Sequence, residues 1–297
     1  MNRSMPRSVF HLPVAIQLAS LVIAFTANSC LADETDSEAS WRLLFDSISR
    51  KYQLLREADS DDASRLQLAE GPVYVWGRPQ SQGSTYGAVY VWTHKGSAEA
   101  VACLWRYVNP GGQRAIVHEL HSLSPVKIRS EGDFDTWRTH SGASLLPIAG
   151  SDGQVSERPV ARLQQMRTIG RNFALDSVSA SGDRVHLRLL PQPFYRTQST
   201  DPSILDGALF AFVCSVGTDP EAFLQLTAIQ TDDGPRWHWS LARFSHHNLY
   251  ASYKGRDVWA SERDVNNPMS HNADHTYWMI SQPFQPSMLE ALEAREK

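Results

Sequence analysis

The stretch Tyr86–Trp105 reads YGAVYVWTHKGSAEAVACLW and carries the strongest strand pattern in the chain. A Lys-Gly-Ser turn separates its two apolar runs, and this arrangement predicts an antiparallel hairpin. Valine and aromatic residues alternate before the turn, at Val89, Tyr90, Val91 and Trp92. Because side chains alternate between the faces of a strand, both faces of this strand are apolar and both must be covered. The hairpin is therefore expected at the centre of the fold.

A second stretch, Asp206–Leu226, reads DGALFAFVCSVGTDPEAFLQL and follows the same plan. Each stretch has Gly-Ala, an apolar run, a Gly-Ser or Gly-Thr turn, and Glu-Ala before a second apolar run. Other matches, such as Pro72-x-Tyr74 with Pro193-x-Tyr195, keep nearly the same offset of about 120 residues. This near-constant offset predicts a tandem duplication.

The predicted fold class is α+β, with one copy at residues 33–155 and a second at residues 156–297. Each copy is expected to have one N-terminal helix and a five- to six-stranded antiparallel meander. The helices are predicted over Asp36–Arg50, after a capping box at Thr35-x-x-Glu38, and over about Glu157–Gly170. The copies are expected to pack as one pseudo-symmetric body, with two separate units in series as the alternative.

Residues 1–32 have the pattern of a secretory signal peptide. Two arginines precede the apolar run Val14–Ala27, which is shorter than the ~20 residues that a membrane-spanning helix needs. Cleavage after Ala32 places Cys30, a small residue, at the -3 position. The protein is therefore predicted to be secreted or periplasmic. A lipoprotein modified at Cys30 is the alternative, although the residues before this cysteine match a lipoprotein signal poorly.

Removal of the signal peptide leaves two cysteines, Cys103 and Cys214. An oxidising compartment allows them to form one disulfide. Two free thiols in the core are the alternative, because unpaired cysteine behaves as a small hydrophobic residue.

The composition excludes several classes of function. The net charge is -4 with both signs interspersed, and no basic tract indicates nucleic-acid binding. No segment after the N-terminus is long and apolar enough to span a membrane. The sequence lacks the motifs of dinucleotide and ATP-phosphate binding, of zinc peptidases and of serine hydrolases. A few weak constellations of side chains remain.

The first constellation is a histidine cluster in loop-like sequence, formed by His246, His247, His271, Asp274 and His275. Imidazoles and a carboxylate suit zinc or copper. The alternative is a set of surface histidines, because the spacing is not that of a known metal motif. No cofactor is predicted otherwise. His118 and His121 belong to a predicted strand and point to opposite faces, so we interpret them as partly exposed strand histidines.

The second constellation is Arg236-Trp237-His238-Trp239, which places two indoles on one face of a strand beside a guanidinium. Arg236, Trp237 and Trp239 are therefore candidates for binding a sugar or an aromatic ligand. Two core tryptophans are the alternative, because aromatic residues favour strands.

Residues of the second copy also carry a family resemblance. They are Asp206-Gly-Ala-Leu-Phe-Ala-Phe-Val, Gly217-Thr-Asp-Pro-Glu221 and Trp239-x-x-Ala242-Arg243. This part of the chain resembles a family of uncharacterised exported proteins from planctomycete bacteria. The resemblance implies export and no particular activity.

Residues shared between the two copies are mostly of packing and turn types, so they favour a structural rather than a catalytic role. The leading hypothesis is a secreted or periplasmic, non-catalytic binding or scaffold protein whose ligand or partner lies outside the cytoplasm. A metal-dependent enzyme that uses the histidine cluster is one alternative. A carbohydrate-binding module that uses exposed tryptophan is the other.

Overall fold

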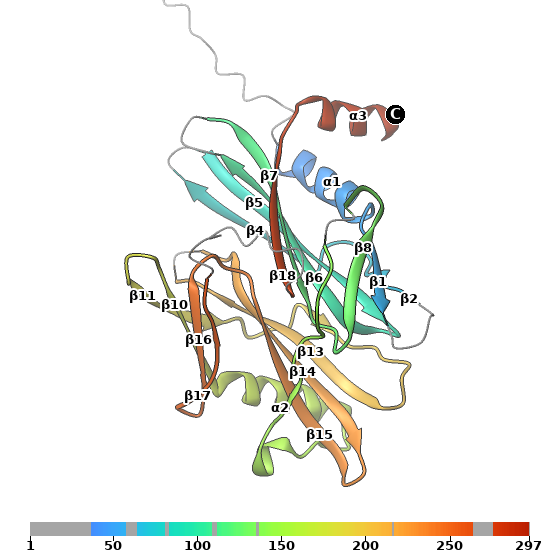
Figure 1. Cartoon of the computed structure of the whole chain (residues 1–297), viewed down its shortest axis with the longest axis vertical. Helices are drawn as coiled ribbons and strands as arrows, with labels where there is room; N and C mark the ends of the chain where they lie inside the picture. The colour runs from blue at the N-terminus through green and yellow to red at the C-terminus, as the bar shows by residue number, and fades with distance from the viewer. Residues whose placement is uncertain are drawn as a thin grey trace, which may run out of the picture. The chain divides into compact units, whose positions relative to one another are not determined.

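The structure is a computed structural model that describes residues 37–57, 64–80, 83–108, 112–134, 137–215, 217–263 and 276–296. Figure 1 shows antiparallel sheets flanked by a few helices. Within the described residues, 52% lie in strands and 17% are helical. The α-helices of this part of the chain are α1 (Glu38–Ser49), α2 (Pro159–Arg171) and α3 (Ser287–Glu296), and short 3-10 turns occur at Gly132–Phe134 and Gly150–Gly153.

Three sheets contain these strands. The six-stranded sheet has the order β18-β7-β6-β5-β3, and β4 also pairs with β5. Its strands are β3 (Gln67–Leu68), β4 (Tyr74–Gln80), β5 (Gly83–His94), β6 (Ser97–Val108), β7 (Arg114–Ser122) and β18 (Tyr277–Pro283). The three-stranded sheet has the order β2-β1-β8. Its strands are β1 (Gln53–Glu57), β2 (Ser64–Arg65) and β8 (Lys127–Glu131).

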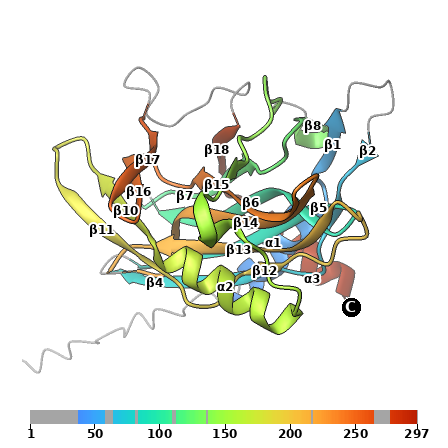
Figure 2. The ribbon, with the colours of Figure 1, turned by 90° about the horizontal axis from the view of Figure 1, so that it is seen from below.

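The nine-stranded sheet has the order β17-β16-β10-β11-β13-β14-β15-β9, and β12 pairs with β13. Its strands are β9 (Leu146–Pro147), β10 (Phe173–Val178), β11 (Arg184–Leu189), β12 (Tyr195–Arg196), β13 (Ile204–Val213), β14 (Pro220–Thr231), β15 (Gly234–Arg243), β16 (Asn248–Tyr253) and β17 (Arg256–Ser261). Figure 2 shows α2 lying along one face of this sheet.

The hairpin predicted around Lys95 and Gly96 is present as β5 and β6. Both turn residues have positive φ, 48° and 78°, as the tight turns that match strand twist require. Val89 and Val91 pack in a layer between the six-stranded and nine-stranded sheets, against residues such as Leu209 and Phe223 of the latter. The aromatic face of β5 packs in a separate core with α1. Both faces of β5 are therefore covered, as the sequence predicted.

The prediction of an α+β tandem duplication is wrong. The described residues form a mostly β protein with curled antiparallel sheets, and not two copies of a helix followed by a meander. Distant segments complete the sheets. The C-terminal strand β18 pairs with β7, with Trp278 opposite Leu120, and β9, which precedes α2, pairs with β15. Strand β1 pairs with β8 in a sheet of its own. Repeated Gly-Ala and Glu-Ala patterns indicate local strands and turns. They do not indicate which distant strand pairs with the edge of each sheet.

The helices near the two predicted positions begin and end close to the expected residues. The amide of Ser40 donates to Ser37 Oγ, so Ser37 caps α1 in place of the expected Thr35. Thr35 lies outside the described residues. Trp41 and Phe45 are buried on the inner face of α1. The helix α3 was not predicted, and its Leu289 is buried in the same core.

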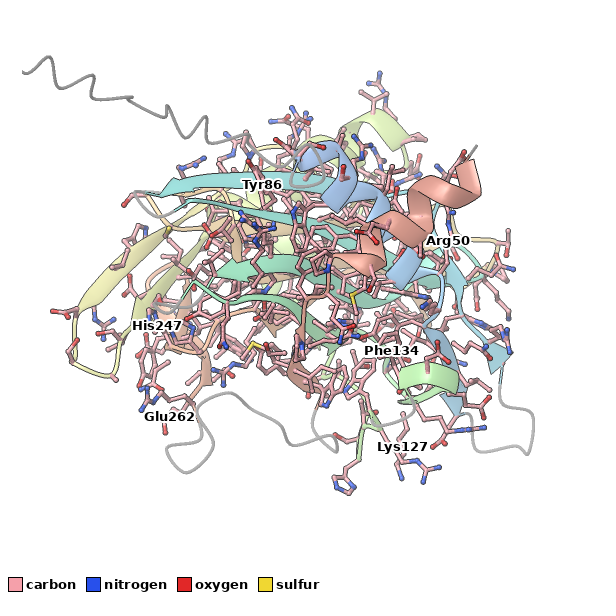
Figure 3. All side chains as sticks on the ribbon, turned by 90° about the horizontal axis from the view of Figure 1, so that it is seen from above. Arg50, Tyr86, Lys127, Phe134, His247 and Glu262 are labelled. Atoms are coloured by element: carbon pink, nitrogen blue, oxygen red, sulfur yellow. The ribbon has the colours of Figure 1, made fainter. Side chains whose placement is uncertain are left out.

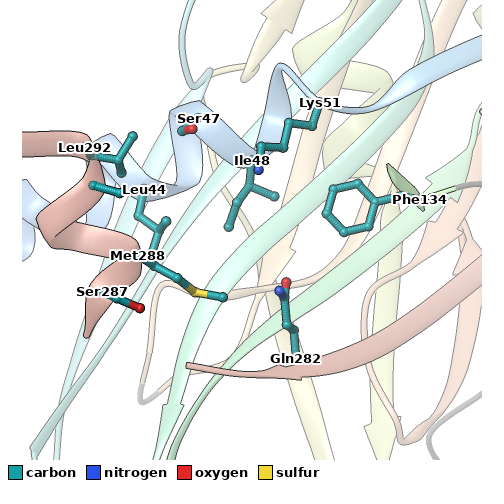
Figure 4. Close-up of a pocket in the computed structure, with 10 residues that line it drawn as sticks. Leu44, Ser47, Ile48, Lys51, Phe134, Gln282, Ser287, Met288 and Leu292 are labelled. Atoms are coloured by element: carbon teal, nitrogen blue, oxygen red, sulfur yellow. The ribbon is translucent and has the colours of Figure 1, made fainter. Parts of the chain in front are cut away.

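A cavity of about 350 Å³ lies in the seam between α1 and α3. Figure 4 shows Leu44 and Ile48 of α1 across from Met288 of α3, with Phe134 and Gln282 on the opposite side of the space. Half of the side chains that line it, including Leu44 and Ile48, belong to the core that packs the two helices against the six-stranded sheet. We therefore interpret it as a packing seam.

Gly87 supplies a test of the hairpin's packing. A Cβ at Gly87 would lie 2.2 Å from the indole of Trp76, and that indole donates to Cys103 Sγ over 3.3 Å. We expect Gly87→Ala to lower the free energy of unfolding by about 3 kcal/mol, because the buried indole must be displaced. Urea unfolding followed by tryptophan fluorescence measures the change.

The matched control is Gly77→Ala, on the strand that pairs with Gly87. A Cβ at Gly77 meets the Tyr86 ring at 3.7 Å, an ordinary contact. This variant should stay within about 0.5 kcal/mol of the parent protein. Equal stability of the two variants would show that Trp76 does not require glycine beneath it.

Candidate functional site

The candidate site is a cavity of about 540 Å³ beside β15, which we call the β15 cavity. Five parts of the chain line it: His121 of β7, residues 140–146, the second half of β15, residues 259–262 at the end of β17, and residues 276–277 at the start of β18. The cavity thus lies where β15 and β17, from opposite ends of the nine-stranded order, approach the β7–β18 edge of the six-stranded sheet. Figure 3 shows Glu262, which lines the cavity, and His247 on the same side of the molecule.

Two indoles line the β15 cavity. Trp239 is 7% exposed and packs against Phe173, with ring centroids 5.2 Å apart. Trp259, on β17, is half-buried and also faces the cavity. Hydroxyl, imidazole and carboxylate groups also line it, from Ser141, Ser144, Ser240, Ser261, His140 and Glu262, together with Leu146 and Leu241. Apolar flat surfaces together with hydrogen-bonding groups are typical of sites for small polar ligands.

The inner wall of the cavity contains Arg243, the last residue of β15. Its guanidinium donates to the backbone carbonyl of Ser245 from Nε over 3.1 Å and from Nη2 over 2.7 Å. Nη1 donates to the carbonyl of Glu262 over 2.9 Å, and Nη2 also donates to that of His247 over 3.1 Å. Arg243 therefore joins the end of β15 to the loop before β16 and to the end of β17. Its donors are engaged with backbone, so its role at the cavity is structural.

Tyr277 and His121 complete the inner wall, and Glu119 lies behind them. The Tyr277 hydroxyl donates to Glu119 Oε1 over 2.5 Å, and the Trp105 indole donates to Glu119 Oε2 over 3.2 Å. The guanidinium of Arg243 lies over the Tyr277 ring, 5.2 Å from its centroid. A carboxyl, a phenol and a guanidinium thus form one buried polar cluster between the sheets.

Burial controls the protonation of this cluster. Desolvation raises the pKa of Glu119 to about 7, although hydrogen bonds from Tyr277 and Trp105 oppose the rise. Desolvation also raises the pKa of the Tyr277 hydroxyl well above its usual value. The pKa of His121 falls to about 4, because burial disfavours the imidazolium. At neutral pH, Tyr277 and His121 are therefore uncharged, whereas Glu119 titrates near neutrality.

The structure brings one of the three predicted ligand-binding residues into the cavity. Trp239 lines it. Trp237 is fully buried on the same strand, and its indole donates to Gln165 Oε1 over 3.4 Å. Arg236 lies near Gln154 at the other end of β15, outside the cavity.

Two of the predicted metal ligands are described. The rings of His246 and His247 lie 4.4 Å apart, and His247 Nδ1 is 2.9 Å from Ser177 Oγ. Burial lowers the pKa of both imidazoles. The other predicted ligands, His271, Asp274 and His275, lie outside the described residues. Within the described part of the chain, no group of three or more His, Cys, Asp or Glu side chains is placed to hold a metal ion.

Sequence reasoning missed Glu119 and misjudged its neighbours. His118 and His121 lie on opposite faces of β7, as predicted, but both are buried rather than partly exposed. His118 Nδ1 is 2.6 Å from the Tyr52 hydroxyl on the α1 side of the sheet. Strand alternation alone places Glu119 on the same face as His121, but the covering of that face by β15 follows only from the fold.

Cys103 and Cys214 are both free and buried. Cys103 belongs to the layer between the two large sheets, whereas Cys214 belongs to the core beneath α2. The structure therefore contains the two free thiols that were the alternative to a disulfide.

Comparison with known proteins places the chain in no established group: no family model, curated protein or solved structure matches it. The resemblance to exported planctomycete proteins stays a prediction. None of the helices in the described residues is long and apolar enough to cross a membrane.

Proposed function

We propose that this is a secreted or periplasmic, non-catalytic binding protein whose ligand, a mono- or oligosaccharide, occupies the β15 cavity. The observation that carries the proposal is the pair of indoles, Trp239 and Trp259, in a cavity that hydroxyl, imidazole and carboxylate groups also line. A sugar ring presents an apolar face to an aromatic side chain and hydroxyls to polar groups, so it matches both parts of this lining.

The polar cluster behind the cavity supports binding rather than catalysis. Glu119 does not line the cavity, and its two oxygens accept hydrogen bonds from Tyr277 and Trp105. A general acid or base must reach the group whose proton it transfers. In the described structure Glu119 instead holds the Tyr277 ring in place as part of the cavity wall.

Export is supported by the signal-peptide pattern of residues 1–32, which lie outside the described residues. The metal-dependent alternative also stays a prediction, because three of its five ligands lie outside them. No described residue favours that alternative over saccharide binding.

Trp259→Ala tests the proposal directly. The purified protein is titrated with a panel of neutral and acidic oligosaccharides, and binding is followed by tryptophan fluorescence and calorimetry. We expect at least one oligosaccharide to bind, and Trp259→Ala to weaken that binding by about ten-fold, because a stacked aromatic surface is lost.

The matched control is Tyr107→Ala, which removes an aromatic side chain that is 40% exposed and lies outside the cavity. The affinity of Tyr107→Ala for the oligosaccharide should equal that of the parent protein. Failure of the whole panel to bind, or equal weakening in both variants, would contradict the proposal. Release of new reducing ends during the titration would instead indicate a hydrolytic enzyme.

A further inference from the structure

A second cavity, of about 400 Å³, lies between α2 and the strand β11, and we call it the α2 cavity. Its polar lining consists of Gln164, Arg167, Arg171 and Gln192, and its apolar lining includes Leu189 and Phe210. It shares no lining residue with the β15 cavity. The lining contains two guanidiniums and no carboxylate.

The two arginines of the α2 cavity lack ion-pair partners in the described part of the chain. Neither guanidinium is within salt-bridge distance of a described carboxylate, whereas Arg162 on the same helix pairs with Asp206 at 2.8 Å. Helix α2 reads PVARLQQMRTIGR and contains no acidic residue. The positive charge of this part of the helix is thus not neutralised by its neighbours.

Both guanidiniums are nevertheless held in place. Arg167 Nη2 donates to Gln192 Oε1, and Arg171 Nε donates to the backbone carbonyl of Arg167 over 3.1 Å. Arg167 Nε is buried and has no hydrogen-bond acceptor. Because a guanidinium has five N–H donors, each arginine keeps donors that no protein group uses.

We propose that the α2 cavity binds an oxyanion carried on an apolar organic group. Residues four apart lie on one face of a helix, so Arg167 and Arg171 face the same ligand. Guanidinium forks match the oxygen geometry of carboxylate, sulfate and phosphate groups. The Gln164 and Gln192 amides add neutral hydrogen-bonding groups, and the surface of Leu189 suits the apolar part of the ligand.

Calorimetry at constant ionic strength tests this site with four probes: inorganic sulfate, inorganic phosphate, benzoate and phenyl phosphate. We expect the aromatic anions to bind more tightly than the inorganic ions, and the ranking of benzoate against phenyl phosphate identifies the preferred oxyanion. Arg167→Gln and Arg171→Gln should each lower the affinity for the tightest-binding probe by about ten-fold or more, because a charged hydrogen-bond donor is lost.

Arg158→Gln is the matched control. Arg158 is exposed, precedes the first turn of the same helix and does not line the cavity, yet its loss changes the net charge equally. Its affinity for the probes should stay that of the parent protein. Arg167→Lys keeps the positive charge but lacks the forked guanidinium. Its affinity for the probes should lie between that of the parent protein and that of Arg167→Gln. Melting temperatures of all variants establish that they are folded.

Three results would overturn the inference. The first is that no probe binds at constant ionic strength. The second is that Arg158→Gln weakens binding as much as Arg167→Gln, which would indicate a diffuse charge effect. The third is that inorganic ions bind as tightly as the aromatic anions. This site is independent of saccharide binding, so Trp259→Ala should leave the affinity for the anions unchanged.

Discussion

Arg243→Met should destabilise the protein by about 3 kcal/mol, because it removes the donor from the buried carbonyl of Ser245 and from the part-buried carbonyls of His247 and Glu262. Arg243 is 8% exposed and donates to the carbonyls of Ser245, His247 and Glu262. Methionine fills much of the same volume but donates no hydrogen bond. The cost is therefore expected to arise from unsatisfied carbonyls and not from a cavity.

Urea unfolding measures the loss, and Arg184→Met is the control. Arg184 is 59% exposed and pairs with Asp176 on the surface. Its replacement should cost less than about 1 kcal/mol, because exposed ion pairs contribute little. Arg243→Met should also loosen the contact between β15 and the end of β17. It should therefore lower the affinity for any ligand of the β15 cavity. Wild-type stability of Arg243→Met would show that water satisfies these carbonyls equally well.

Glu119→Gln should remove the loss of stability that the parent protein shows as pH rises, at the pH-independent cost of the one hydrogen bond that an amide NH2 group cannot accept. The folded-state pKa of Glu119 is about 7 and lies above its ordinary value of 4.5. The folded protein therefore binds more protons than the unfolded chain between these values, and its stability falls as pH rises through this window. Glutamine stays neutral, so the variant should gain up to about 3 kcal/mol relative to the parent protein between pH 4.5 and pH 8.

The buried histidines act in the opposite direction. Burial lowers the pKa of His118 and of His121 to about 4, from 6.5. The unfolded chain binds more protons in this range, so the stability that these residues contribute is fully present above pH 6.5 and is lost as pH falls towards 4. Between pH 4 and pH 7, Glu119 and the two histidines therefore change the stability in opposite directions.

Urea unfolding at intervals of half a pH unit measures how the free energy of unfolding changes with pH, in the parent protein and in Glu119→Gln. The contributions of Glu119 and of the histidines are read from the two curves. Glu262→Gln is the control, because Glu262 is exposed, and its stability profile should follow that of the parent protein. A constant difference between Glu119→Gln and the parent protein from pH 4.5 to pH 8 would contradict a raised pKa at Glu119.

The local parts of the fold were predictable from the sequence. The β5–β6 hairpin was found because alternation and a Lys-Gly turn are signals within one segment. Helices α1 and α2 were found for the same reason. The pairing of β18 with β7 and of β9 with β15 was not predictable, because an edge strand is chosen by tertiary packing and leaves no pattern in either partner.

The candidate site was predictable only in fragments. Trp237 and Trp239 are equivalent in sequence, since both lie on one face of β15. Both belong to the same core cluster, but only Trp239 also lines the cavity. Burial between β7, β18 and β15 raises the pKa of Glu119, and hydrogen bonds from Trp105 of β6 and Tyr277 of β18 oppose the rise. No single segment carries that information.

The pairing of β18 with β7 has a consequence for the order of events during folding. Glu119 and Tyr277 are separated by 158 positions in the chain, yet their strands are neighbours. Contacts of such high sequence separation form slowly, because a long loop must close, at a cost in entropy, before the contacts lower the free energy. Until then, β7 is an open sheet edge carrying Val117, and open edges promote association between chains. A newly synthesised chain therefore has to remain unassociated until β18 has been made and has paired with β7.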